Sequence, residues 1–320
     1  MIDKRRLLAA VLAAGVAAAV PGGAALAQAF PEGRVTMVVG FGAGGMTDVT
    51  SRILANKLEK LLGTTVIVEN KGGAGGTLAI KAVGQMPADG HTLVSLLTDG
   101  PFTGAYQERP IDLADWAIIG GYMPQERVLF AAKSAPFDTA QEMMAYAKTT
   151  PITMSDGGSF WSARVMEAFA KKHQLQVAVV AQRSGQAASN EVLGGHVTMA
   201  ETGTGAPAWS AAKSGELKII ATLTPGGLAA FGMPNVPTFE KLGADFVPRM
   251  FYGYAVRAAT PADRIAKLRA AFKQAVEDPE ARAAMTRIDL TPEWIEPKTY
   301  EDTLRKVAEE GVRLREYLKK

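Results

Sequence analysis

Three glycines near the start of the chain have the spacing of a dinucleotide-binding turn. Gly40, Gly42 and Gly45 form the pattern G-x-G-x-x-G, with a strand-like run before them and an amphipathic helix pattern after them. Glu69 ends the next strand-like run, where an acidic residue would bind the ribose of a nucleotide. The chemistry of such a turn is anion binding, because glycines let the backbone approach a ligand and helix N-termini present free N–H groups.

A second glycine cluster changes this interpretation. The sequence KGGAGG at residues 71–76 also stands between a strand-like run and a helix pattern. Neighbouring parallel strands would bring both loops to one sheet edge, where they could hold a carboxylate as well as a phosphate. The alternative is that these glycines only permit tight turns, and two such loops before helices argue against it. Because the second cluster begins where a ribose would lie, the sequence predicts no dinucleotide and no other cofactor.

The composition excludes several classes of function. The chain has 320 residues, 48% of them hydrophobic, and its formal net charge of +3 is too small for a nucleic-acid-binding surface. It contains no cysteine, which excludes thiolate chemistry, disulfides and a lipid attached to cysteine. The three histidines, His91, His173 and His196, lack metal-site spacing, and no G-x-S-x-G motif is present. The sequence therefore predicts neither a metal site nor catalytic residues.

The first 27 residues have the features of a secretory signal peptide. A basic stretch, DKRR, precedes an alanine-rich apolar run, and Ala25 and Ala27 are the small residues of a cleavage site. A membrane anchor is the alternative, but a span needs about 20 apolar residues and residues 21–23, PGG, interrupt this run earlier. We predict cleavage after Ala27 and a periplasmic protein, exported by the general or the twin-arginine route.

After the leader, short β-rich runs alternate with amphipathic helix patterns. One set covers residues 35–97, and a second begins near Val128. A stretch rich in proline and glycine, residues 225–237, separates the second set from another strand-like run and a final helix pattern at residues 298–320. Such alternation is typical of α/β proteins with mostly parallel sheets. It predicts two lobes of similar build, with the chain crossing between them twice.

Longer motifs carry a family resemblance. The segments VTMVVGFGAGGMTD, VIVENKGGAGGTLA and PADGHTLVSL, and later EVLGGHVTMA, GELKIIATLT and MPNVPTFEKLG, resemble the substrate-binding proteins of tripartite tricarboxylate transporters, also called Bug receptors. The resemblance covers essentially all of the mature chain. It implies a two-lobed α/β fold, a type II-like periplasmic binding protein or Venus flytrap, that delivers its ligand to a membrane permease. Lobe 1 would comprise residues 28–128 and 251–320, and lobe 2 residues 129–250.

The resemblance also implies where the ligand binds. In the family, backbone groups and ordered waters in two glycine loops of the first lobe hold a ligand carboxylate, and the second lobe selects the far end of the ligand. Carried over to this sequence, the two loops are residues 41–48 and 72–77. The candidate contacts in the first lobe are Phe41, Gly42, Ala43, Gly44, Gly45, Thr47, Asp48, Gly73, Ala74, Gly75, Gly76 and, beyond the loops, Thr98. In the second lobe the candidate contacts come from this sequence itself: Ser159, Trp161, Arg183, Ser184 and Glu201.

The second lobe departs from the family pattern. Residues 181–184 read AQRS where the family usually has Pro-Tyr-Lys-Gly. Arg183 could donate to a second polar or anionic group or face solvent, and Glu201 could face the cleft or be a solvated carboxylate. Of Phe160 and Trp161, at least one could wall the cleft, and a core role is the alternative. We expect a ligand with one carboxylate in the glycine loops and a less acidic far end, aromatic or amide-bearing, instead of citrate.

Together these features predict a monomeric periplasmic receptor that is not an enzyme. It would capture a small organic carboxylate and contact permease subunits transiently, without binding nucleic acid. Two alternatives stay open. The chain could be a ligand-sensing subunit of a signalling partner, or an α/β enzyme that uses the first glycine loop for a nucleotide. A neighbouring permease gene would favour transport over sensing.

Overall fold

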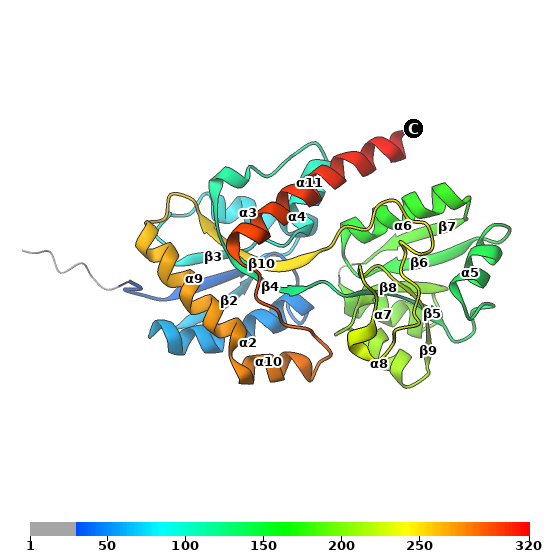
Figure 1. The fold of residues 1–320 in the computed structure, drawn as a ribbon, viewed down its shortest axis with the longest axis horizontal. Helices are drawn as coiled ribbons and strands as arrows, with labels where there is room; N and C mark the ends of the chain where they lie inside the picture. The colour runs from blue at the N-terminus through cyan, green and yellow to red at the C-terminus, as the bar shows by residue number, and fades with distance from the viewer. Residues whose placement is uncertain (1–29, 183) are drawn as a thin grey trace, which may run out of the picture.

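The protein consists of two lobes, each built around a five-stranded sheet (Figure 1). The computed structural model describes residues 30–182 and 184–320. The expected signal peptide and Arg183 lie outside the described residues. Among the helices of the described part, none has the length and apolar character needed to span a membrane. The predicted two-lobed α/β fold is confirmed.

The sheet of lobe 1 combines four strands that run in the same direction with one that runs opposite to them. Its strand order is β2 (Val66–Asn70), β1 (Val35–Val39), β3 (Thr92–Ser95), β10 (Phe251–Arg257) and β4 (Trp116–Pro124). β1 pairs in parallel with β2 and β3, whereas β10 runs antiparallel to both of its neighbours. The parallel strands bring the two glycine loops together at one edge of the sheet, as the sequence predicts.

The sheet of lobe 2 repeats this pattern. Its order is β7 (Val177–Ala181), β6 (Ile152–Asp156), β8 (Met199–Gly203), β5 (Arg127–Ala132) and β9 (Leu217–Thr222). β6 pairs in parallel with β7 and β8, and β5 runs antiparallel to β8 and β9. In each sheet the strand that follows a crossing of the chain, β5 or β10, takes the fourth position. The two lobes therefore have the same build, as expected.

Helices cover the faces of both sheets (Figure 1). Those of lobe 1 are α2 (Met46–Leu62), α3 (Thr77–Gly84), α4 (Asp99–Tyr106), α9 (Ala262–Glu277), α10 (Pro279–Thr286) and α11 (Pro297–Lys319). Those of lobe 2 are α5 (Ala140–Ala147), α6 (Phe160–His173), α7 (Gly185–Leu193) and α8 (Pro207–Lys213). Short 3₁₀ turns lie at Ala74–Gly76, Leu113–Asp115 and Ala229–Phe231. The sequence pattern does not reveal β4, α4 or α8.

The helix after the first glycine loop follows directly from its sequence. Leu54, Leu58 and Leu62 recur at four-residue spacing on α2, and all three are buried in the core of lobe 1. Gly63 ends the helix in the left-handed conformation, with φ 70°, and its N–H donates to the carbonyl of Glu59 at 3.0 Å. A side chain is unfavourable in that conformation, so glycine fixes the point where α2 stops.

The chain passes between the sheets at residues 125–126 and again just before β10. β5 begins at Arg127, so Arg127 and Val128, which the sequence analysis placed in lobe 1, belong to the lobe 2 sheet. A further connection comes from α11, which Figure 1 shows reaching from lobe 1 towards α6. Leu314 of α11 packs in the same core as Phe169 of α6. The lobes are thus joined by two chain segments and one shared apolar core.

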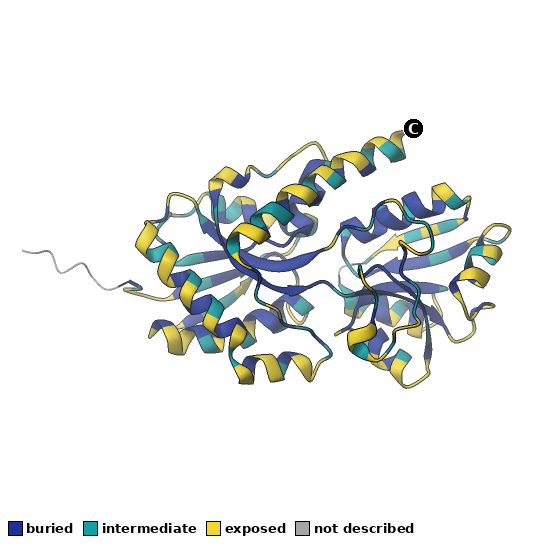
Figure 2. Ribbon diagram, in the orientation of Figure 1, coloured by how far each residue is buried: buried dark blue, intermediate teal, exposed yellow. Residues whose placement is uncertain are grey.

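The interior of lobe 1 is dense at β10, where the strand is buried on both faces (Figure 2). A side-chain carbon on Gly253 would fall against the ring of Tyr300, 2.7 Å from its hydroxyl oxygen. Tyr300 cannot move aside, because it is fully buried and its hydroxyl donates to the carbonyl of Leu96 at 2.8 Å.

We therefore expect Gly253→Ala to lower the free energy of unfolding by about 1 to 3 kcal/mol through overpacking. Urea denaturation of the purified protein measures the change. The control is Gly33→Ala, because a carbon added at Gly33 meets nothing within 4 Å. Equal stability of the two variants would contradict the prediction.

Candidate functional site

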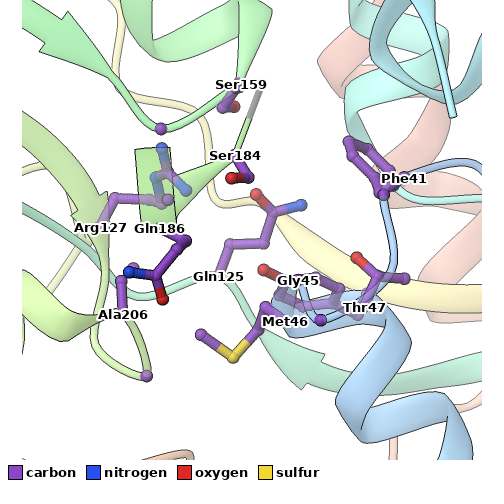
Figure 3. Close-up of a pocket in the computed structure, with 18 of the residues that line it drawn as sticks. Phe41, Gly45, Met46, Thr47, Gln125, Arg127, Ser159, Ser184, Gln186 and Ala206 are labelled. Carbon is purple, nitrogen blue, oxygen red and sulfur yellow. The ribbon is translucent and has the colours of Figure 1, made fainter. Parts of the chain in front are cut away.

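A cavity of about 190 Å³ lies between the lobes. Figure 3 shows that its walls come from both sides and from the first crossing segment. Lobe 1 supplies Phe41, Gly42, Gly44, Gly45, Met46, Thr47, Leu97, Asp99 and Tyr252; lobe 2 supplies Arg127, Gly157, Gly158, Ser159, Ser184, Gly185, Gln186, Gly203, Gly205, Ala206 and Pro207; Gln125 belongs to the crossing. The volume is near the ~150 Å³ of a cavity that holds benzene, so it suits a small molecule.

The N-terminus of α2 opens into this cavity. Gly45, the residue before the helix, has no side chain to cap it, and the first helical hydrogen bond runs from the Val49 N–H to the Gly45 carbonyl. The N–H groups of Met46 and Thr47, residues that line the cavity, therefore have no partner within the helix. Free N–H groups and the positive end of the helix dipole favour a bound anion here.

Two helices of lobe 2 present their N-termini to the same space. Ser159 immediately precedes α6, and Ser184 immediately precedes α7; both line the cavity. The hydroxyl oxygen of Ser184 accepts the N–H of Ala187 at 3.2 Å and so caps α7. Three helix dipoles thus point their positive ends at the cavity, which makes it a site for a negatively charged ligand.

Arg127 is the only lysine or arginine among the described residues that line this cavity. Its Nε and Nη2 donate to the two carboxylate oxygens of Glu201, each at 2.5 Å, and the pair is almost fully buried. The hydroxyl of Ser162 donates to Glu201 Oε2 at 2.7 Å. The positive charge of Arg127 is therefore already balanced by the protein, and the arginine can offer a ligand hydrogen bonds without offering an excess charge.

Asp99 connects the lobes at the floor of the cavity. Its Oδ2 accepts from Gln125 Nε2 at 2.5 Å, and its Oδ1 accepts from the hydroxyl of Ser159 in lobe 2 at 2.9 Å. Burial raises the pKa of the Asp99 carboxyl, although both hydrogen bonds oppose the rise. The contact between Asp99 and Ser159 depends on the distance between the lobes, so it forms only when they are close together.

Asp156 shapes the loop before α6. Its Oδ1 accepts the N–H groups of Gly158 at 2.6 Å and Ser159 at 3.1 Å. Burial, and next the negative charge of neighbouring Glu201, raise the pKa of Asp156 to about 6. The loop that carries Ser159 is therefore held by a carboxyl that is costly to ionise.

The structure brings many of the expected residues to the cavity. Phe41, Gly42, Gly44, Gly45, Thr47, Ser159 and Ser184 line it. Gly73, Ala74 and Gly75 of the second glycine loop line an adjoining cavity instead, which Phe41 and Gly42 also border. The two loops touch, because a carbon added at Gly40 would stand 2.7 Å from Gly76 Cα. The loops are adjacent as expected, but only the first loop borders the smaller cavity, whereas both border the adjoining one.

Several residues that were expected to contact the ligand stabilise the protein instead or lie away from the cavities. Asp48 braces the first loop: burial disfavours its ionised form, but hydrogen bonds from Arg52 and the Gly44 N–H hold its pKa below the usual value. Thr98 is buried and exchanges hydrogen bonds with the backbone of Phe251. Neither residue lines either cavity of the described part, and the same is true of Ala43 and Gly76.

The expected cleft positions of Trp161 and Glu201 are wrong, and Arg183 lies outside the described residues. Trp161 is 1% exposed and packs in the core of lobe 2, so it does not wall the cleft. Its neighbour Phe160 borders the adjoining cavity. Glu201 is buried against Arg127, so it is neither a solvated carboxylate nor a free acceptor for a ligand amine.

Sequence reasoning missed the polar residues at the crossing. Gln125 and Arg127 flank the point where the chain changes lobe, and Asp99 begins a helix that the sequence analysis lacked. A signal was present, since Arg127 is the one charged residue of the otherwise apolar strand RVLFAA. Within the described ranges, no group of three or more His, Cys, Asp or Glu side chains could hold a metal ion.

Comparison with known proteins identifies the family. The model of the tripartite tricarboxylate transporter family receptor matches residues 50–319. The chain belongs to this receptor family. The family prediction is therefore confirmed, and the protein is a receptor of the tripartite tricarboxylate transporter type.

Relatives of this receptor match most of its length. A Cupriavidus necator protein described as "UPF0065 protein in gbd 5'region" is 32% identical over 308 residues, which are 93% of this chain and 91% of that one. The solved structure of the periplasmic binding protein BugD has a TM-score of 0.78 at 23% identity and covers 89% of this chain and 97% of its own. MatC from Rhodopseudomonas palustris, with bound malate, has a TM-score of 0.74 at 21% identity, covering 89% and 100%.

The raised pKa of Asp156 predicts a pH effect on stability. The folded protein holds this proton up to about pH 6, whereas the unfolded chain releases it near 3.8. Stability therefore falls as the pH rises from about 4 to 6, by up to about 3 kcal/mol. Asp156→Asn keeps an oxygen acceptor for Gly158 and Ser159 but cannot ionise.

The expected result is that Asp156→Asn loses this part of the pH dependence and gains stability over the wild type above pH 6. Urea unfolding at pH 4, 5, 6 and 7 measures it. Asp302→Asn serves as the control, because the Lys298 hydrogen bond lowers the pKa of exposed Asp302. If the free energy of unfolding of Asp156→Asn depends on pH as that of the wild type does, Asp156 does not titrate between pH 4 and 6.

Proposed function

We propose that this receptor binds a small organic carboxylate in the cavity between its lobes and presents it to permease subunits in the membrane. The observation that carries the proposal is the convergence of the N-termini of α2, α6 and α7 on one cavity. Helix N-termini stabilise an anion without requiring a lysine or arginine for every negative charge. The malate bound to MatC, a protein of the same fold, supports the same ligand class.

The orientation of the ligand follows from the charges. Its carboxylate lies at the N-terminus of α2, where the N–H groups of Met46 and Thr47 and the Thr47 hydroxyl can donate. The part of the ligand that shares the first cavity with the carboxylate lies near Asp99, Gln125 and Arg127, which offer both donors and acceptors but little net charge. This environment favours a neutral polar group, such as a hydroxyl or an amide, over a second carboxylate. We therefore place monocarboxylates and hydroxy acids ahead of citrate.

The proposal extends to location and mode of action. The leader at residues 1–27 directs the chain to the periplasm and is removed after Ala27, and the mature protein acts as a monomer. It performs no chemistry on the ligand, because its cavity holds the ligand by hydrogen bonds and its signal is the approach of the lobes. Permease subunits recognise the closed form and bind it transiently. The full binding free energy is gained only when both lobes contact the ligand, so ligand binding is coupled to closure of the lobes.

A thermal-shift screen of mono-, di- and tricarboxylates tests the ligand class, with NAD and ATP as ligands that are not expected to bind. The matching variant is Thr47→Val, which removes one hydroxyl from the buried cavity wall. We expect it to weaken the best acid about tenfold or more, as for a lost hydrogen bond to a charged group. Calorimetry gives the dissociation constant.

Thr303→Val, on α11 and away from both cavities, is the control and is expected to bind like the wild type. Micromolar binding of NAD or ATP would overturn the receptor mechanism. Unchanged affinity in Thr47→Val would show that the carboxylate does not lie at the start of α2.

Lobe closure has its own test at Gly205. A carbon added there would stand 2.5 Å from Met46 Cε, the flexible end of that side chain, and 3.3 Å from Cδ2 of buried Leu290, and both residues belong to the opposite lobe. Gly205→Val should hold the lobes apart, so that saturating ligand no longer reduces the radius of gyration measured by X-ray scattering, and affinity falls at least about tenfold. Gly33→Val, with open space around it, is expected to close normally. Full compaction of Gly205→Val would exclude Met46 as a closure contact.

A further inference from the structure

A second and larger cavity, of about 610 Å³, adjoins the first. It also lies between the lobes, bordered by the second glycine loop on one side and by α6 and the end of β7 on the other. Phe41, Gly42 and Gly158 border both cavities. Two of these three residues have no side chain, and a carbon added at Gly42 meets nothing within 4 Å. The boundary between the cavities therefore leaves room beside the ring of Phe41.

The second cavity has aromatic walls from both lobes. Phe41 of lobe 1 packs its ring against Gly76, where an added carbon would stand 3.4 Å from the ring. Phe160 of lobe 2 borders the opposite side, with the guanidinium of Arg164 5.3 Å from its ring centre. Ala163 and Ala181 complete the wall with small apolar side chains. Flat aromatic surfaces and small residues favour a flat apolar group.

The charges of the second cavity do not favour a second anion. Arg164 already pairs with Glu167 at 2.5 Å, and Asp156 adds a carboxyl to the wall. Gln182 is neutral. Among the described residues, Glu167 balances the charge of Arg164, although the buried Nε of Arg164 has no hydrogen-bond partner. A negatively charged group would approach Asp156, whereas an apolar group meets aromatic and alanine surface. The two cavities thus differ in character: the first suits an anion, and the second suits a neutral ring.

We propose that the two cavities form one ligand site for an aryl-substituted carboxylate. The carboxylate occupies the first cavity at the start of α2, the chain passes Gly42 and Gly158, and the aromatic ring lies between Phe41 and Phe160. This proposal rests on the proposed carboxylate function and adds the class of ligand. The Phe41 ring is the wall that both parts of the ligand contact.

A matched pair of acids separates the two cavities. Propionate fills only the first, and 3-phenylpropionate carries the same acid with a ring for the second. Calorimetry on the full-length mature protein is expected to show at least about tenfold tighter binding of 3-phenylpropionate, because the ring leaves water for an apolar cavity. Ala181→Trp, an exposed position at the end of β7, fills the second cavity and should remove this preference while propionate affinity stays unchanged.

Ala178→Trp is the control, because Ala178 is exposed on the same strand and does not border either cavity. It is expected to keep the preference for the ring. Equal affinity of the two acids in the wild type, or an unchanged preference in Ala181→Trp, overturns the aryl proposal and leaves the carboxylate function intact. Failure of both acids to bind overturns both proposals.

Discussion

A buried ion pair at the first crossing of the chain organises the region between the lobes. Arg127 is the first residue of β5, and its guanidinium is enclosed together with the carboxylate of Glu201 on the neighbouring strand. Taking two charges out of water is costly, so the pair is stable only with good geometry and additional hydrogen bonds. Ser162 supplies one such bond, and Gly157 leaves the space, because a carbon added there would stand 3.0 Å from Arg127 Nη2. The loop before α6 therefore takes its position from this pair.

The contacts between the lobes fall into two groups with different consequences. On one side, α11 packs its apolar residues against α6, and Lys171 donates to the carbonyls of Tyr317 and Leu318 at the helix end. This group is extensive and apolar, as expected of an axis about which the lobes move. On the cavity side the contacts are few and polar, such as Asp99 with Ser159 and Thr204 with the carbonyl of Asp289. Such contacts can break and re-form at low cost, which suits a cavity that must admit a ligand.

The sequence predicts the fold better than the site. Alternating β-rich and amphipathic runs are local signals, so the two lobes, the glycine loops and the course of α2 were predictable. Which side chain faces the cavity depends on where a helix starts, because successive residues differ by about 100° around its axis. α6 begins directly at Phe160, so Phe160 borders a cavity and Trp161 turns into the core. The pairing of Glu201 with Arg127 joins residues far apart in the chain, and no local pattern reveals it.

The dinucleotide fingerprint shows how similar turns can serve different purposes. In a Rossmann domain the acidic residue after the second strand would face the ribose. Here Glu69 is exposed and pairs with Lys71 at 3.3 Å, while the amide of Asn70 donates to the carbonyl of Phe41 at 3.1 Å. The space that a ribose would need is occupied by the second glycine loop, which packs directly on Gly40. Gly40 is thus required for contact between the two loops. Gly40 also borders the second cavity, and the later glycines of the first loop leave an open path to the backbone N–H groups at the start of α2.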